Sequence, residues 1–157
     1  HPVELEGDVV RRAIERIRAA GAIVYTQAPL MRRVNDDAAT WREKWATELS
    51  LGMVPYYMFV ARDTGAQDYY KVPLTRAAEV YRDAWSGLSG LGRTVRGPVM
   101  SATPGKVAVD GIATLDGVRV LALRLLQARD PSLVGRPFWA HENSSAAWVD
   151  EIVAGRA

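Results

Sequence analysis

The sequence contains no cysteine and only two histidines among its 157 residues. Without a thiol, the chain itself cannot form a disulfide, a thiolate zinc site or an iron–sulfur centre, and two histidines alone make a poor metal-ligand set. No apolar run reaches the roughly 18 residues that a membrane-spanning helix needs, and no secretory signal pattern opens the chain. We therefore expect a cytoplasmic protein with no membrane partner.

The chain also lacks a tract of one charge. Its 20 basic and 18 acidic residues leave a formal net charge of +2, and the arginines are scattered along the expected helices, so we expect no nucleic-acid partner. A length of 157 residues with 48% hydrophobic residues is enough for one hydrophobic core. The first residue is His1 rather than Met, and "HPVELEGDVV" is typical of a loop that leads into a helix. We therefore expect a piece of a longer protein.

Helical and strand patterns alternate along the first hundred residues. The expected helices cover 8–21, 37–52 and 73–92, and the expected strands cover 22–30, 53–61 and 93–100. Alternation with short links is typical of parallel strands joined by helices. Three such strands fit the C-terminal part of an open, partial α/β barrel of the TIM type better than a closed domain.

Apolar residues recur at helical spacing on the first two expected helices. Val9, Ile14 and Ile17 predict a buried face on the first helix, and Trp41 and Trp45 predict a buried stripe on the second.

Beyond Lys106 the apolar period changes to two. Asp110-Gly111 and Asp116-Gly117 are expected as hairpin turns, which predicts an antiparallel hairpin appendage. The tail is expected to be irregular up to Ser144 and then to form a short helix. This divides the chain into a barrel part, 1–106, and a hairpin with its tail, 107–157.

Four short blocks follow one another in a particular order and spacing. They are "HPVEL" at the start, "TQAPLMRRVND" over 26–36, "PYYMF" over 55–59 ahead of "VPL", and "PGKV" over 104–107. Together they resemble the C-terminal half of lysine 2,3-aminomutase and its relatives. In that family, a radical made from S-adenosylmethionine and the cofactor pyridoxal phosphate together move an amino group between adjacent carbons of an amino acid.

The resemblance implies that a missing N-terminal half-barrel carries the three-cysteine motif for a 4Fe-4S cluster. This chain has no cysteine, so it is expected to be inactive alone. From about residue 118 the tail is similar to that of a less understood subgroup of the same family, whose substrate the resemblance does not supply.

Lys106 aligns with the family lysine that holds pyridoxal phosphate. Such chemistry needs a primary amine that is neutral for part of the time and can yield its bond to a substrate amine. The glycine run that precedes this lysine in the family, and lets the backbone approach the cofactor, is reduced here to Pro104-Gly105. The alternative is a lysine that only leads into a strand.

Gln27 matches a family glutamine expected to hydrogen-bond S-adenosylmethionine. It lies near the end of the first expected strand, where parallel α/β folds place their ligands. The alternative is an amide that satisfies the neighbouring loop.

The lysine enzymes hold the distal ammonium of their substrate with two aspartates. Counting without gaps, Arg62 and Val99 stand at those positions. Neither can bind an ammonium group, so we expect an amino-acid substrate other than lysine. Arg62 suits a distal carboxylate, as in a relative that acts on glutamate. The alternative is a solvated charge beside Asp63.

Two other functions fit the same residues. One is a radical S-adenosylmethionine protein that has lost pyridoxal phosphate and carries out different radical chemistry. The other is a non-catalytic fragment whose exposed strand edges serve assembly with another chain. Whichever function holds, the exposed edges are expected to make this chain associate as a homo-oligomer.

Overall fold

The computed structural model describes residues 1–62, 64–103 and 105–153. Its helices and strands are, in chain order, η1 (Pro2–Leu5), α1 (Asp8–Ala19), β1 (Tyr25–Leu30), α2 (Ala38–Ser50), β2 (Val54–Val60), α3 (Gln67–Tyr70), α4 (Leu74–Ser86), η2 (Gly90–Gly92), β3 (Arg96–Ala102), β4 (Gly105–Leu115), β5 (Val118–Ala128), η3 (Pro131–Leu133), β6 (Pro137–His141) and α5 (Val149–Val153). The three helices and three strands expected in the first hundred residues are confirmed. Asp63 and Pro104 lie outside the described residues.

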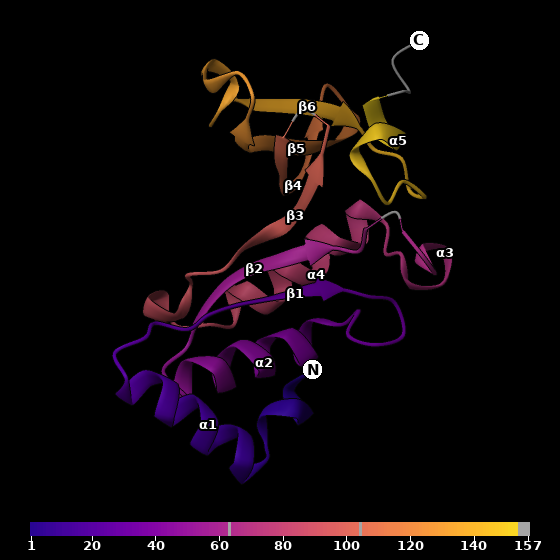
Figure 1. The fold of residues 1–157 in the computed structure, drawn as a ribbon. Helices are drawn as coiled ribbons and strands as arrows, with labels where there is room; N and C mark the ends of the chain where they lie inside the picture. Colours follow the sequence, from indigo (N-terminus) through magenta and orange to yellow (C-terminus); the bar gives the residue numbers. More distant parts are fainter. Residues whose placement is uncertain (63, 104, 154–157) are drawn as a thin grey trace.

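The described strands form one open six-stranded sheet in the order β1-β2-β3-β4-β5-β6. As the sequence predicts, β1 to β3 run parallel, whereas β4, β5 and β6 each run antiparallel to the preceding strand. Figure 1 shows α1 and α2 beneath β1 and β2, with β6 and α5 at the other end of the molecule. The fold is therefore mixed α/β, and its described sheet does not close into a barrel.

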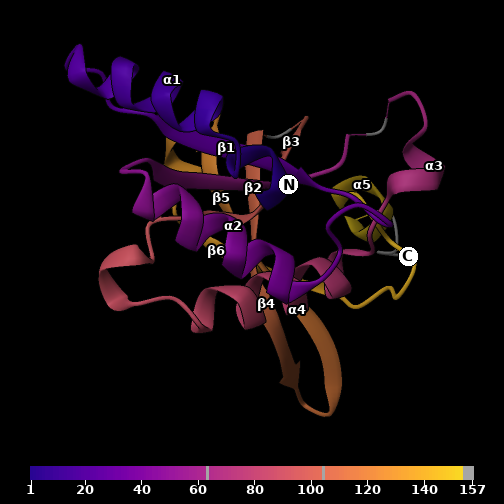
Figure 2. The ribbon, with the colours of Figure 1, turned by 90° about the horizontal axis from the view of Figure 1, so that it is seen from below.

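The predicted turn at Asp110-Gly111 is wrong. These residues lie inside β4, where the pairing with β5 shifts register between Val109 and Gly111. A β-bulge accommodates the extra residue, and glycine tolerates the altered backbone there. The chain reverses only at Asp116-Gly117, where φ is 49° and 81°, as a tight hairpin requires. Figure 2 shows this hairpin projecting beyond α4.

The expectation of an irregular tail up to Ser144 is also wrong. Pro137–His141 forms β6, which pairs with β5 from Val120↔His141 to Arg124↔Pro137. A strand of five residues carries too little pattern of its own to be recognised, because its pairing partner specifies it.

One hydrophobic cluster joins the sheet to α2 and α4. It contains Leu30, Trp41, Trp45, Met58, Val72, Ala77, Val80, Ala84, Leu88 and Val95. Trp41 and Trp45 are fully buried, as predicted, with 0% and 1% exposure. A second cluster packs β3 to β6 against α4 and α5. Both clusters lie on one face of β1 and β2, and the opposite face carries the candidate site.

The buried face expected on α1 is mostly absent. Ile14 is buried, but Val9 and Ile17 are 73% and 49% exposed. The helix lies beside β1, the edge strand of the sheet, so no further strand is present to cover its apolar side. None of the described helices is long and apolar enough to cross a membrane.

Asp37 caps the N-terminus of α2, and its removal should weaken the fold. Its carboxylate accepts hydrogen bonds from the Thr40 hydroxyl at 2.6 Å and the Thr40 backbone N–H at 2.8 Å. The Thr40 side-chain bond, followed by the backbone bond, lowers the pKa of Asp37. We expect Asp37→Ala to reduce the free energy of unfolding at pH 7 by about 1 kcal/mol in urea titrations.

The pH dependence of this effect has a definite sign. Because the pKa of Asp37 is lowered in the folded state, its contribution is present above the unfolded pKa and is lost as the pH falls through the folded pKa. Asp37→Asn is the matched control, since asparagine also caps helices but does not titrate. A loss at pH 7 as large for Asp37→Asn as for Asp37→Ala would contradict the cap.

Candidate functional site

The face of the parallel strands opposite α2 and α4 carries alternate side chains of β1 and β2. In the β1–β2 ladder, Gln27 pairs with Tyr57 and Pro29 pairs with Phe59. Gln27 and Pro29 are exposed, while Tyr57 is buried in a small cluster with Val99 and Ala108. Ligands of parallel α/β folds bind at the carboxyl ends of the strands, so the rim beyond these residues is where a site is expected.

Lys106 lies on this face, directed towards the rings of β2. Its ammonium nitrogen is 4.6 Å from the ring centroid of Tyr57 and 5.9 Å from that of Phe59. The residue pairs with Ser101 across the β3–β4 ladder. No carboxylate pairs with it in the described part of the chain, so the aromatic rings are its main electrostatic partners.

Gly105 has a structural reason to precede Lys106. Its φ is +144°, and a Cβ atom at this position would collide with the backbone carbonyl of Gln127 on β5. A glycine is therefore required where β4 approaches β5 closely. This requirement is independent of any cofactor.

A cavity of about 330 Å³ lies at the carboxyl ends of β1, β2 and β3. Its lining residues come from the three strands, the loop after β2 and the C-terminal segment: Gln27, Pro29, Phe59, Val60, Arg62, Ser101 and Trp148. Gln27 and Arg62 thus share one cavity. Lys106 lies next to this cavity, because its ammonium nitrogen is 5.9 Å from the ring centroid of Phe59 and its backbone pairs with that of Ser101. The structure therefore brings the three predicted site residues to one end of the sheet.

Arg62 and Val99, the two residues expected at the positions of the aspartates of the lysine enzymes, have different surroundings. Arg62 is exposed in the loop after β2, and within the described residues it has no hydrogen-bond or ion-pair partner. Val99 is 0% exposed and lies against Tyr57 and Ala108. Neither position offers an anion that could hold an ammonium group.

Tyr56 and Tyr57 extend the aromatic surface towards the amino ends of the strands. Their ring centroids are 4.1 Å apart, and the Arg96 guanidinium lies 5.5 Å from the Tyr56 ring. A hydrogen bond with the Tyr57 side chain is the main cause of the raised pKa of Tyr56. Cations thus lie beside both tyrosines, Arg96 at Tyr56 and Lys106 at Tyr57.

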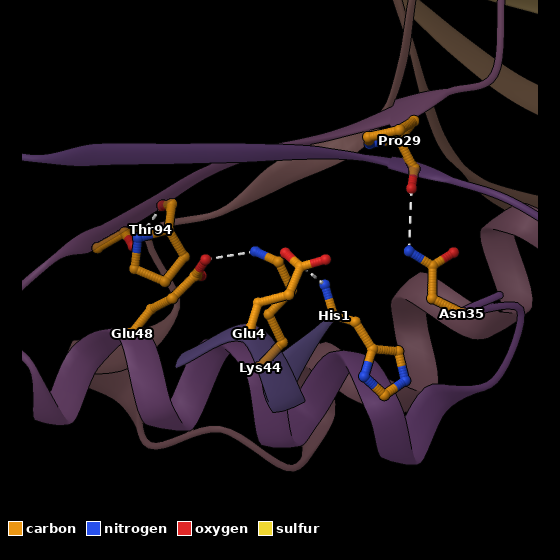
Figure 3. A network of polar contacts seen from close by, with 8 residues as sticks. His1, Glu4, Pro29, Asn35, Lys44, Glu48 and Thr94 are labelled. Carbon is orange, nitrogen blue, oxygen red and sulfur yellow. Dashed lines mark hydrogen bonds and ion pairs between the residues drawn. The ribbon is translucent and has the colours of Figure 1, made fainter. Parts of the chain in front are cut away.

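Asn35 has a structural role in the turn that follows β1. It is 5% exposed, and its amide accepts a hydrogen bond from the Met31 N–H and donates one to the Pro29 carbonyl (Figure 3). The indole N–H of Trp41 donates to the Asn35 carbonyl at 2.7 Å. These bonds fix the turn that follows β1, and with it the wall of the cavity.

Two site features were missed by the sequence analysis. Ser101 and Trp148 both line the cavity, and Trp148 comes from the tail, in which no site residue was predicted. A tryptophan in a segment without clear periodicity gives no signal of its own, because its position depends on a distant contact. The described residues contain no group of three or more acidic or histidine side chains that could hold a metal ion.

The fold and cavity define an α/β chain that presents an amine, an amide and a guanidinium at the carboxyl ends of parallel strands. The chain is 28% identical over 151 residues, 96% of its length, to a protein of Aquifex aeolicus (strain VF5) named "Putative L-lysine 2,3-aminomutase", of which it covers 39%. It is 33% identical over 91 residues, 58% of its length, to a protein of the same name from Treponema pallidum (strain Nichols), of which it covers 25%.

These similarities confirm the resemblance to the lysine 2,3-aminomutases and are consistent with a C-terminal fragment of such a protein. The chain spans less than half the length of either relative. No protein-family model matches the chain.

Proposed function

We propose that this chain is the C-terminal portion of an aminomutase-like isomerase that moves an amino group between adjacent carbons of an amino acid other than lysine. The observation that carries the proposal is the convergence of Lys106, Gln27 and Arg62 at the carboxyl ends of the parallel strands. The similarity to two proteins named as L-lysine 2,3-aminomutases supports the same reaction class.

The residues around Lys106 fit pyridoxal phosphate. The amine lies over the Tyr57 and Phe59 rings, which offer a flat apolar surface beside a covalent attachment point. When bound, the cofactor supplies an electron sink for the migrating nitrogen. Lys106 would hold it covalently, and Phe59 would keep water from the amine.

Gln27 and Arg62 would bind the other reactants. The exposed amide of Gln27 can hydrogen-bond S-adenosylmethionine. The guanidinium of Arg62, which has no partner among the described residues, can hold a carboxylate at the distal end of the substrate. This chain has no thiolate for a 4Fe-4S cluster, so radical formation would depend on another part of the enzyme.

The exposed edge of the sheet supports a missing N-terminal half-barrel. β1 is an edge strand, and Val9, Ile17, Ile23 and Tyr25 near it are between 49% and 73% exposed. An unpaired parallel strand flanked by apolar side chains favours association. The preceding half of a TIM-type barrel would cover this edge, and a homo-oligomer is the alternative cover for the isolated chain.

We further propose that the chain divides at Lys106 into a barrel part and a hairpin with its tail. The hairpin is an appendage to the barrel, and the protein is cytoplasmic. A relative that has lost pyridoxal phosphate would keep the sheet but not the covalent chemistry of Lys106. A non-catalytic fragment would use the β1 edge alone.

Reductive labelling tests the pyridoxal part of the proposal. The chain is incubated with pyridoxal phosphate, reduced with borohydride, digested and mapped by mass spectrometry. We expect one main adduct, on Lys106, because the Lys44 amine is paired with Glu48 in the protein interior and the Lys71 amine is hydrogen-bonded to Asp68 at 2.7 Å. Equal labelling of Lys71 and Lys106, or no labelling at saturating cofactor, would favour one of the alternatives.

A further inference from the structure

We propose that Trp148 is a substrate-binding residue and that, with Arg62 and Ser101, it forms a pocket for a carboxylate. This inference rests on the proposed function in one respect, since the carboxylate would be the distal group of the amino-acid substrate. The residues that line the pocket all belong to this chain.

Trp148 is held in place by a well-anchored segment. The carbonyl of Ala146 accepts a hydrogen bond from the Leu74 N–H at 2.8 Å, which ties the segment to the start of α4. The N–H of Ala147 donates to the Glu151 carboxylate at 3.1 Å. Ala146 and Ala147 are 0% and 1% exposed. The indole is therefore presented to the cavity by a rigid support rather than by a loose tail.

The indole N–H is available to a ligand. Trp148 is only 7% exposed, and among the described residues nothing accepts a hydrogen bond from this N–H. Trp148 also lines the 330 Å³ cavity, so a ligand in that cavity can reach the indole. A tryptophan N–H in such a position usually finds an acceptor.

The other polar groups of the cavity favour an anionic acceptor. Arg62 supplies a permanently charged guanidinium with five N–H donors, and Ser101 supplies a hydroxyl. None of the described residues that line the cavity is an aspartate or a glutamate. A single arginine with neutral donors matches the one negative charge and the planar oxygens of a carboxylate. The Phe59 and Trp148 rings would bury the methylene groups that carry it.

Titration of the 157-residue chain without cofactor shows which anionic ligand the pocket binds. Isothermal titration calorimetry compares L-glutamate with L-glutamine, which differ only in the distal group, and with inorganic phosphate. We expect L-glutamate to bind at least about tenfold more tightly than L-glutamine, the ratio that one charge-assisted hydrogen bond supports. Inorganic phosphate should not compete.

Two substitutions and two matched controls locate the pocket. Arg62→Gln should weaken L-glutamate binding by at least about tenfold, and Trp148→Phe by about three- to tenfold, because phenylalanine keeps a ring but lacks the N–H. Arg82→Gln and Trp139→Phe change the same residue types outside this cavity and should leave binding unchanged. The thermal midpoint of each variant is measured to exclude unfolding.

Each other outcome overturns the inference. Unchanged binding in a folded Trp148→Phe variant would leave the indole a packing residue, and competition by phosphate would assign the pocket to a phosphoryl group. No binding of L-glutamate to the unmodified chain would also refute the pocket. The proposed function fails separately: absence of a pyridoxal adduct in the labelling experiment, with L-glutamate binding intact in the unmodified chain, would refute the pyridoxal proposal alone.

Discussion

Replacement of Glu48 by alanine is expected to destabilise the folded chain by about 3–5 kcal/mol, since it leaves one charge of a buried pair without its partner. Lys44 and Glu48 lie one turn apart on α2, form an ion pair (Figure 3) and are 7% and 3% exposed. After the substitution the Lys44 ammonium would remain in the interior, with the Trp41 ring 5.7 Å away as its remaining partner. Urea titration at pH 7 measures the loss.

The double variant with Lys44→Met and Glu48→Leu separates charge from packing. Apolar replacement of both partners removes the desolvation cost together with the attraction, so we expect a stability close to that of the original chain. Asp68→Ala is the matched single substitution in the exposed pair with Lys71, and it should cost far less than Glu48→Ala, because water screens that pair. A similarly small loss for Glu48→Ala would mean that water solvates the pair.

The burial of Lys44 and Glu48 could not be predicted from the sequence of α2 alone. Lysine and glutamate four residues apart are typical of a solvated helix surface. Here η1, formed by Pro2–Leu5, lies against α2 and helps to cover that surface. The contact joins segments about forty residues apart in the sequence, so no local sequence pattern predicts it.

The parallel part of the sheet could be predicted because its signals are local. The runs that became β1 and β2 are short, apolar and β-branched or aromatic, and each is followed by a helix with a recognisable start. The burial of α1 could not be predicted in the same way. Its apolar spacing is that of a helix with a covered face, but in this structure the described residues provide no cover for Val9 and Ile17.

The residues of the candidate site could also be predicted only in part. Gln27, Arg62 and Lys106 were proposed from a resemblance that fixes residues in order along the chain. The sheet register then places Gln27 opposite Tyr57 and Lys106 opposite Ser101. The resemblance did not identify Trp148 as a site residue, because Trp148 reaches the cavity only through the anchoring of its segment at Leu74.

Lys106→Ala is expected to abolish covalent attachment of pyridoxal phosphate to the chain. The substitution removes the only described amine over the Tyr57 and Phe59 rings. The near-visible absorption band of the covalently bound cofactor and the borohydride-fixed adduct should therefore both disappear. Lys106 pairs through its backbone with Ser101, and alanine keeps those backbone bonds. We therefore expect the free energy of unfolding to change by no more than about 1 kcal/mol, mainly from lost contact with the rings.

Lys106→Arg and Lys71→Ala make this expectation specific. Arginine keeps a cation over the rings but cannot form the covalent bond, so Lys106→Arg should lose the adduct while retaining the stability of the original chain. Lys71→Ala removes a lysine from the segment between β2 and α4 and should leave labelling intact. An adduct that persists in both Lys106 variants and moves to another amine would mean that the cofactor reacts with exposed lysines without a site. The Lys106 side chain would then serve only to cover the aromatic face of β2, and the enzyme of which we propose that this chain is a part would have to hold any pyridoxal cofactor elsewhere.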